Sequence, residues 1–192
     1  MIVVAMRVSS VLYIFCKSTS MVLLGIYLLK TLTYSAFAIE FKVKKIGKSL
    51  SNPWGIAVLS KDEILVTERA GGIYRVNLIN GSTKSIKNVP KVVSKRQGGL
   101  LDILVDQDNK KKNNIYLCFS RQETDGVSTA LSVSSLQNNK LISTKILFSA
   151  NNKSNSAIHF GCRISIKGDY IYLSIGDRGN RNQSQNPSSH AG

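Results

Sequence analysis

The stretch Gly55-Ile-Ala-Val58 leads through the polar turn Ser60-Lys-Asp62 into Glu63-Ile-Leu-Val-Thr67. Both apolar runs are short and rich in aliphatic, β-branched residues, and turn residues bound them. This pattern predicts two strands joined in a hairpin. The same unit recurs twice, with Asp102-Ile-Leu-Val105 leading into Ile115-Tyr-Leu117, and Arg163-Ile-Ser-Ile166 leading into Ile171-Tyr-Leu173. The sequence therefore predicts an internal repeat of strand pairs.

The spacing of the repeat predicts an all-β propeller. Ile56 and Ile103 lie 47 residues apart, and Ile103 and Ile164 lie 61 apart, which implies extra residues between positions 121 and 156. A period near 45 residues with about four short strands per unit is typical of propeller blades. No segment from residue 39 onward keeps a helical apolar period. The expected blades are residues 50–90, residues 97–149, and the first half of a third at residues 160–183.

Two and a half blades do not close a ring. Propellers usually have four to eight blades, because a closed ring leaves no long unpaired edge. The sequence thus predicts an incomplete propeller, a fragment of a longer reading frame.

The first 38 residues have the layout of a secretory signal peptide. They carry Arg7, Lys17 and Lys30 but no acid, and the apolar run Met21-Val-Leu-Leu-Gly-Ile-Tyr-Leu-Leu29 is followed by Ala36-Phe-Ala38. That order predicts export and cleavage after Ala38. A membrane anchor is the alternative, although the uninterrupted apolar run of 9 residues is short for a span. The expected domains are a signal peptide at 1–38 and a periplasmic or secreted propeller domain at 39–192, with no membrane span after cleavage.

The chain is basic, with a formal net charge of +15. Its cations are scattered, apart from Lys110-Lys-Lys112 in an expected turn, and no basic helix or aromatic-interleaved stripe occurs. We therefore expect no nucleic-acid partner.

The three cysteines do not form a metal motif. Cys16 lies in the leader, and Cys118 and Cys162 lie in apolar, strand-like runs without CxxC spacing, so a zinc site is not expected. Buried free thiols are the default expectation. A single disulfide is the alternative in an oxidising compartment.

Three glycine-containing motifs lie near the predicted blade starts and turns. They are Arg96-Gln-Gly-Gly-Leu-Leu-Asp102, His159-Phe-Gly-Cys-Arg163 and Gly176-Asp-Arg-Gly-Asn-Arg-Asn-Gln183. Loops that lead into the innermost strands of a propeller converge at the mouth of its channel. There a histidine can accept a proton, a carboxylate can fix its tautomer, and amides can bind hydroxyls. A single histidine beside glycines is more often structural; the order and position of all three motifs favour a site.

These motifs, together with Asn52-Pro-Trp-Gly-Ile-Ala57, resemble the glucose/sorbosone dehydrogenase family. Its members are soluble aldose dehydrogenases that use pyrroloquinoline quinone (PQQ) and have a six-bladed β-propeller of four-stranded antiparallel blades. The resemblance covers residues 48–192. It implies an oxidoreductase that oxidises aldose sugars at C1 by hydride transfer to PQQ and passes electrons to an external acceptor.

The resemblance also implies roles for individual residues. His159 matches the catalytic base, Asp177 the acid that orients it, and Gln97 and Gln183 polar residues at the substrate and quinone pocket. Arg163 is expected to be structural, fixing neighbouring carbonyls or an acid. PQQ and calcium are the implied cofactors. Most groups for the PQQ carboxylates and the calcium ligands belong to the family's second half, so no metal ligand is assigned in this sequence.

The sequence departs from the family pattern near the histidine. Ile158 stands where Asp or Asn often occurs, and Cys162 replaces Gly or Ser. Two alternatives therefore remain, a non-catalytic propeller that binds a protein or glycan and a calcium-dependent lactonase-type propeller. No GxGxxG motif follows a predicted strand, so a dinucleotide site is not supported.

Overall fold

The computed structural model describes residues 2–4, 42–106 and 114–191. The chain divides into two compact units, Ile2–Lys45 and Ile46–Gly192. In the first unit, β1 (Ile2–Val4) pairs antiparallel with β2 (Val43–Lys45). The predicted signal peptide, apart from β1, and the lysine-rich turn at 110–112 lie outside the described residues, so both stay predictions.

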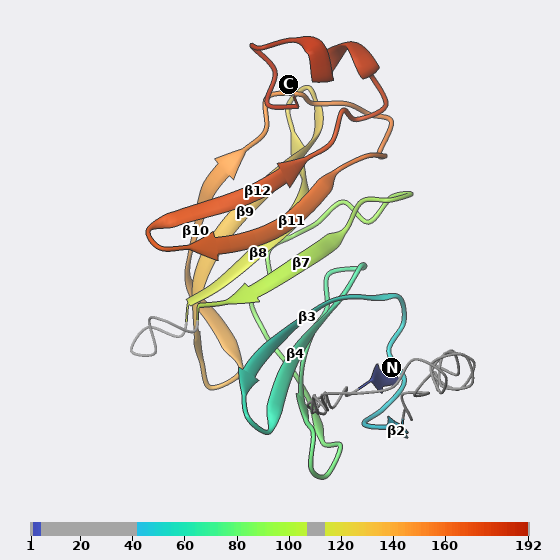
Figure 1. Cartoon of the computed structure of the whole chain (residues 1–192), viewed down its shortest axis with the longest axis vertical. Coiled ribbons are helices and arrows are strands. Elements are labelled where there is room, and N and C mark those ends of the chain that lie inside the picture. Colours follow the sequence, from blue (N-terminus) through green and yellow to red (C-terminus); the bar gives the residue numbers. More distant parts are fainter. Residues whose placement is uncertain (1, 5–41, 107–113, 192) are drawn as a thin grey trace, which may run out of the picture. The chain divides into compact units, whose positions relative to one another are not determined.

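The second unit contains three antiparallel sheets in which every strand pairs with its neighbour in the chain (Figure 1). The first sheet comprises β3 (Pro53–Ser60), β4 (Glu63–Glu68), β5 (Ile73–Asn77) and β6 (Thr83–Ser85). The second comprises β7 (Leu100–Val105), β8 (Asn114–Glu123), β9 (Gly126–Gln137) and β10 (Lys140–Ser149). The third comprises β11 (Gly161–Lys167) and β12 (Tyr170–Ile175), and the short 3-10 helix η1 (Arg181–Gln185) follows it.

The predicted all-β propeller architecture is confirmed. Two four-stranded sheets and one strand pair correspond to the two and a half blades expected from the repeat. The first strands of the three sheets lie next to one another, with β7 in contact with both β3 and β11. The extra length of the second repeat lies largely in its strands, since β8, β9 and β10 have 10, 12 and 10 residues.

Side-chain alternation along β8 explains how the second sheet packs against both of its neighbours. Leu117 and Phe119 belong to a core cluster shared with residues of the first sheet, such as Leu65. Cys118, between them, belongs to a cluster shared with Phe160 and other residues of the third sheet's segment. Successive side chains of a strand point to opposite faces. One strand therefore contributes to two cores.

The second cluster contains a disulfide between Cys118 on β8 and Cys162 on β11, with 5.5 Å between their Cα atoms. The default expectation of free thiols is therefore wrong, and the alternative of one disulfide is correct. The reason is that Cys118 points to the face of the second sheet that packs on β11. The spacing of two cysteines in the sequence does not show which faces of their two sheets pack together.

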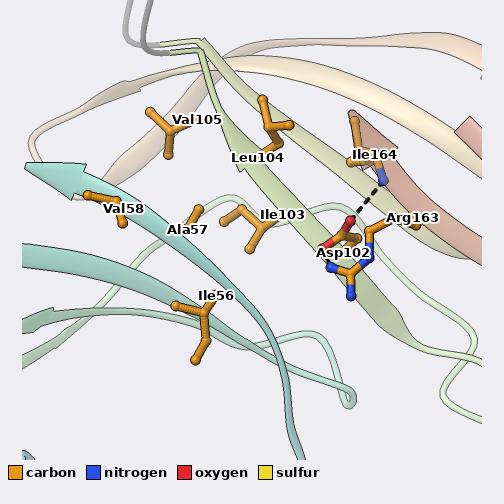
Figure 2. Close-up of a pocket in the computed structure, with 9 residues that line it drawn as sticks. All are labelled: Ile56, Ala57, Val58, Asp102, Ile103, Leu104, Val105, Arg163 and Ile164. Carbon is orange, nitrogen blue, oxygen red and sulfur yellow. Dashed lines mark hydrogen bonds and ion pairs between the residues drawn. The ribbon is translucent and has the colours of Figure 1, made fainter. Parts of the chain in front are cut away.

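A groove of about 430 Å³ runs between the first strands of the three sheets (Figure 2). Its lining is mostly apolar and comes from β3, β7 and β11, with Asp102 and Arg163 at one side. Ile56 and Val58 on β3 are more than half exposed there, at 53% and 58%. Within the described residues, no helix has the length and apolarity needed to cross a membrane.

Candidate active site

His159 lies two residues before β11, at the end of the loop from the second sheet. Its backbone is left-handed, with φ of 50°, and its N–H donates to Gln97 Oε1 at 2.8 Å. Gln97 lies just before β7, so the neighbouring sheet fixes the backbone of the histidine. The imidazole is half exposed, at 52%. Gln97 fixes the backbone of His159, and the half-exposed imidazole is accessible to a small molecule.

Asp177 holds the imidazole from the other end of the same hairpin. Its Oδ1 lies 2.7 Å from His159 Nδ1 and also accepts the Gly179 N–H at 2.8 Å. The Gly179 hydrogen bond, then the bond to His159, lower the pKa of Asp177, and the charges of His159 and Arg181 add to this. Asp177 is therefore ionised at neutral pH. A carboxylate at Nδ1 favours a proton on that nitrogen and leaves Nε2 as the acceptor of the neutral ring.

The hairpin geometry brings the two residues together. Gly161 at the start of β11 pairs with Ile175 at the end of β12, so the residues before one strand and after the other are neighbours. Gly176 makes this approach close: a Cβ on Gly176 would lie 2.1 Å from the His159 carbonyl oxygen. No side chain larger than hydrogen fits there without displacing the His159 backbone.

Arg178, the residue after Asp177, is a buried cation. Only 2% of the residue is exposed, its guanidinium lies 3.4 Å from the Phe160 ring centroid, and it donates to the carbonyls of Ile158 and Val127. Burial lowers its pKa to about 10, partly opposed by the charge of Asp177. The group is still cationic at neutral pH. Arg178 had no predicted role, and its place beside Asp177 in a glycine-containing motif is the one signal in the sequence that pointed to it.

The structure brings three of the four sequence-predicted site residues together. Gln97, His159 and Asp177 form one hydrogen-bonded chain. Gln183 lies half buried in η1, where its N–H donates to the Asn180 carbonyl and its carbonyl accepts the Asn186 N–H. No hydrogen bond among the described residues links Gln183 to the histidine, and its role at the cofactor stays a prediction.

Arg163 and Asp102 form a second polar contact between the sheets (Figure 2). Asp102 Oδ2 accepts the Ile164 N–H at 2.8 Å, and its Oδ1 lies 3.2 Å from Arg163 Nη1. Asp102 is buried, whereas the Arg163 side chain is 80% exposed. As expected for this arginine, it contacts a neighbouring acid. The buried carboxylate was part of a quoted motif but had no predicted role.

The residues around His159 fit a quinone cofactor in part. The half-exposed imidazole and the Gln97 amide offer hydrogen-bonding groups, and both Gln97 and His159 are exposed. Calcium is different. Residues 2–4, 42–106 and 114–191 hold no group of three or more His, Cys, Asp or Glu side chains able to bind a metal ion. Calcium also binds backbone and amide carbonyls, so no calcium ligand is assigned here.

Fold and site together define a propeller with a histidine–carboxylate pair at the loop ends of one blade. The pattern of the glucose/sorbosone dehydrogenase family matches residues 50–192, and the chain belongs to this family. Aldose sugar dehydrogenase YliI of Escherichia coli strain K12 is 28% identical over 148 residues, 74% of this chain and 40% of that protein.

Two solved structures show the same fold. The apo-form of the soluble aldose sugar dehydrogenase from Escherichia coli has a TM-score of 0.70 and 26% identity, over 76% of this chain and 43% of that one. The PQQ-bound aldose sugar dehydrogenase from Streptomyces coelicolor has a TM-score of 0.64 and 25% identity, over 76% of this chain and 44% of that one. The chain spans less than half the length of each relative.

Proposed function

We propose that this chain carries the acid–base part of the active site of a PQQ-dependent aldose dehydrogenase, with His159 as the catalytic base. The observation that carries the proposal is the 2.7 Å contact between His159 Nδ1 and Asp177 Oδ1, made by a half-exposed ring. Family membership and the PQQ-bound relative support the choice of reaction.

Oxidation of a sugar at C1 requires the anomeric hydroxyl to lose its proton while the C1 hydrogen leaves as hydride. Nε2 of His159 takes the proton, and the imidazolium that forms is stabilised by the Asp177 carboxylate. The Gln97 contact holds the backbone of the base in place. A positioned base typically contributes about 10²–10⁴-fold to the rate. The carbonyl forms as both hydrogens depart, which gives a lactone from a cyclic aldose.

PQQ, when bound, supplies the hydride acceptor, and an external acceptor then removes the electrons. From the described part of the chain, Gln97 and Gln183 are the residues proposed to contact the quinone. Calcium is proposed from family membership alone, and no step is assigned to it.

The test is sugar-dependent dye reduction by the wild type, His159→Ala and Asp177→Asn with saturating PQQ and calcium. The 192-residue chain is assayed together with the same chain extended by the C-terminal blades of the Escherichia coli relative, because this chain spans only 40% of that protein. We expect His159→Ala to lose about 10²–10⁴-fold in turnover while still binding PQQ. Asp177→Asn should fall between the two, because it keeps the base but weakens its orientation.

Near-wild-type turnover of His159→Ala with a lowered melting temperature would show that the histidine is structural. Arg121→Lys is a suitable control, because the Arg121 side chain pairs with Glu123, at 3.5 Å between Nη1 and Oε1, and with Ser149, and both partners lie on the second sheet. It should leave turnover unchanged.

We also propose that the protein acts in the periplasm or outside the cell. The support is the leader pattern at residues 1–38 together with the Cys118–Cys162 disulfide, since disulfides persist mainly in oxidising compartments. N-terminal sequencing of the exported protein should begin at Ile39. Recovery of an intact Met1 or Met21 in a membrane fraction would contradict cleavage after Ala38.

A further inference from the structure

The segment that carries His159 is tied to the second sheet at five places within eight residues. The five ties reach four residues of the second sheet and its leading loop, because Gln97 makes two of them. They are Ala157 O to Gln97 N–H (3.1 Å), His159 N–H to Gln97 Oε1 (2.8 Å), Phe160 O to Thr129 Oγ1 (2.9 Å), Cys162 to Cys118 (disulfide) and Ile164 N–H to Asp102 Oδ2 (2.8 Å).

The same segment has an unusual backbone. Three of its non-glycine residues are left-handed: Ala157 with φ of 55°, His159 with φ of 50° and Cys162 with φ of 74°. Side-chain-bearing residues rarely adopt this region, and they stay there only where their surroundings enforce it. The conformation that presents His159 to Asp177 therefore depends on the ties to the second sheet.

One of these ties is covalent and lies in a dry environment. Cys118 and Cys162 are 0% and 3% exposed and belong to the core cluster with Leu101, Val127 and Phe160. Cys162 is three residues from His159 and is itself one of the left-handed residues. The hydrogen-bonded ties can open and close thermally, whereas the disulfide cannot, and its burial shields it from reductants. It is therefore a permanent constraint on the segment.

We propose that the Cys118–Cys162 disulfide is the positioning element that holds His159 on Asp177. Its importance for sugar oxidation rests on the proposed function, but its effect on the imidazole does not. Without the disulfide, the segment relaxes toward ordinary backbone conformations and the Nδ1 hydrogen bond to Asp177 is lost for much of the time.

The chain has two histidines, which makes the imidazole NMR signals a direct readout. His190 serves as the internal reference through its tautomer, because its Nδ1 accepts the Asn151 N–H at 2.9 Å. Its ring shift is not used, since the ring packs on Phe148, which contacts the cluster around the disulfide. Long-range ¹H–¹⁵N spectra report the tautomer and the hydrogen bond of each ring. They need no sugar, cofactor or turnover, so absence of dehydrogenase activity would count against the proposed function alone.

The full chain is compared with the double variant Cys118→Ala/Cys162→Ala. We expect the His159 signals to shift toward an averaged mixture of tautomers and to broaden, while the His190 tautomer stays as in the wild type. Ser134→Ala is the matched control: it removes the 2.8 Å hydrogen bond to Thr144 inside the second sheet and should move neither histidine. Unchanged His159 signals in a folded double variant would overturn the proposal.

A second variant decides the question if the double variant does not fold. Thr129→Val removes the neighbouring tie to the Phe160 carbonyl but keeps the disulfide. We expect its His159 signals to match the wild type, because the covalent tie still holds the segment. Displaced His159 signals in this variant would show that hydrogen bonding, and not the disulfide, positions the base. Peptide mapping without reduction should recover Cys118 and Cys162 in one linked peptide, and free thiols at these positions would also refute the proposal.

Discussion

Gly176→Ala is expected to disrupt the His159–Asp177 pair by steric contact alone. The added Cβ would lie 2.1 Å from the His159 carbonyl oxygen and 2.6 Å from its carbonyl carbon, whereas ordinary contacts begin near 3.4 Å. The His159 carbonyl must therefore move by more than about 1 Å, although its oxygen also accepts the Arg178 N–H. Overpacking of this kind costs about 3 kcal/mol. In a domain of this size that lowers the melting temperature by roughly 10 °C.

Gly168→Ala is the matched control in the same hairpin. It lies in the turn between β11 and β12, has φ of +56°, and has nothing within 4 Å of an added Cβ. Its cost is backbone strain of about 1 kcal/mol, or roughly 3 °C. Circular dichroism melts measure the difference, and the imidazole NMR signals show whether His159 moved. Equal melting temperatures for the two variants, with unchanged His159 signals in Gly176→Ala, would refute the steric reasoning.

Two further predictions concern the charged groups around the pair. Arg178→Lys should lose about 2 kcal/mol in the free energy of unfolding, because a lysine has one nitrogen where the planar guanidinium reaches the Ile158 carbonyl with Nη1 and the Val127 carbonyl with Nη2. A urea titration measures this, and a loss below about 0.5 kcal/mol would contradict it. Asp177 has a lowered folded-state pKa, so its stabilising contribution is complete above its unfolded pKa of about 4 and is lost as the pH falls through the folded value. The melting temperatures of the wild type and Asp177→Asn should therefore differ at pH 6 and converge as the pH falls below 4. A difference in melting temperature that stays constant with pH would show that the charge of the Asp177 carboxylate does not contribute to stability.

The hairpins and blades could be predicted because their signals are local. Short apolar runs bounded by turn residues specify strands, and their recurrence specifies blades, as the antiparallel pairing of β3 with β4 shows. The Asn138–Asn139 turn between β9 and β10 is equally local, since asparagine tolerates the left-handed φ of 46° and 58° found there.

The parts that could not be predicted depend on contacts between blades. Cys118 and Cys162 are 44 residues apart, and their pairing depends on which faces of β8 and β11 meet. The roles of Asp102 and Arg178 likewise depend on backbone groups of other strands. Asp102 accepts the Ile164 N–H of β11, and Arg178 donates to the Val127 carbonyl of β9. His159 and Asp177 were found through the family resemblance, because 18 residues of separation carry no signal of contact by themselves.

The alternation along β8 also bears on how the three sheets unfold. Since Leu117 and Phe119 serve one core cluster and Cys118 serves the other, loosening β8 weakens both clusters in a single event. The second sheet contributes to both clusters, so the stabilities of the first and third sheets are coupled through it. Amide hydrogens of β4 and β11 should then exchange with similar opening free energies when β8 is destabilised, so that the blades open as one cooperative unit.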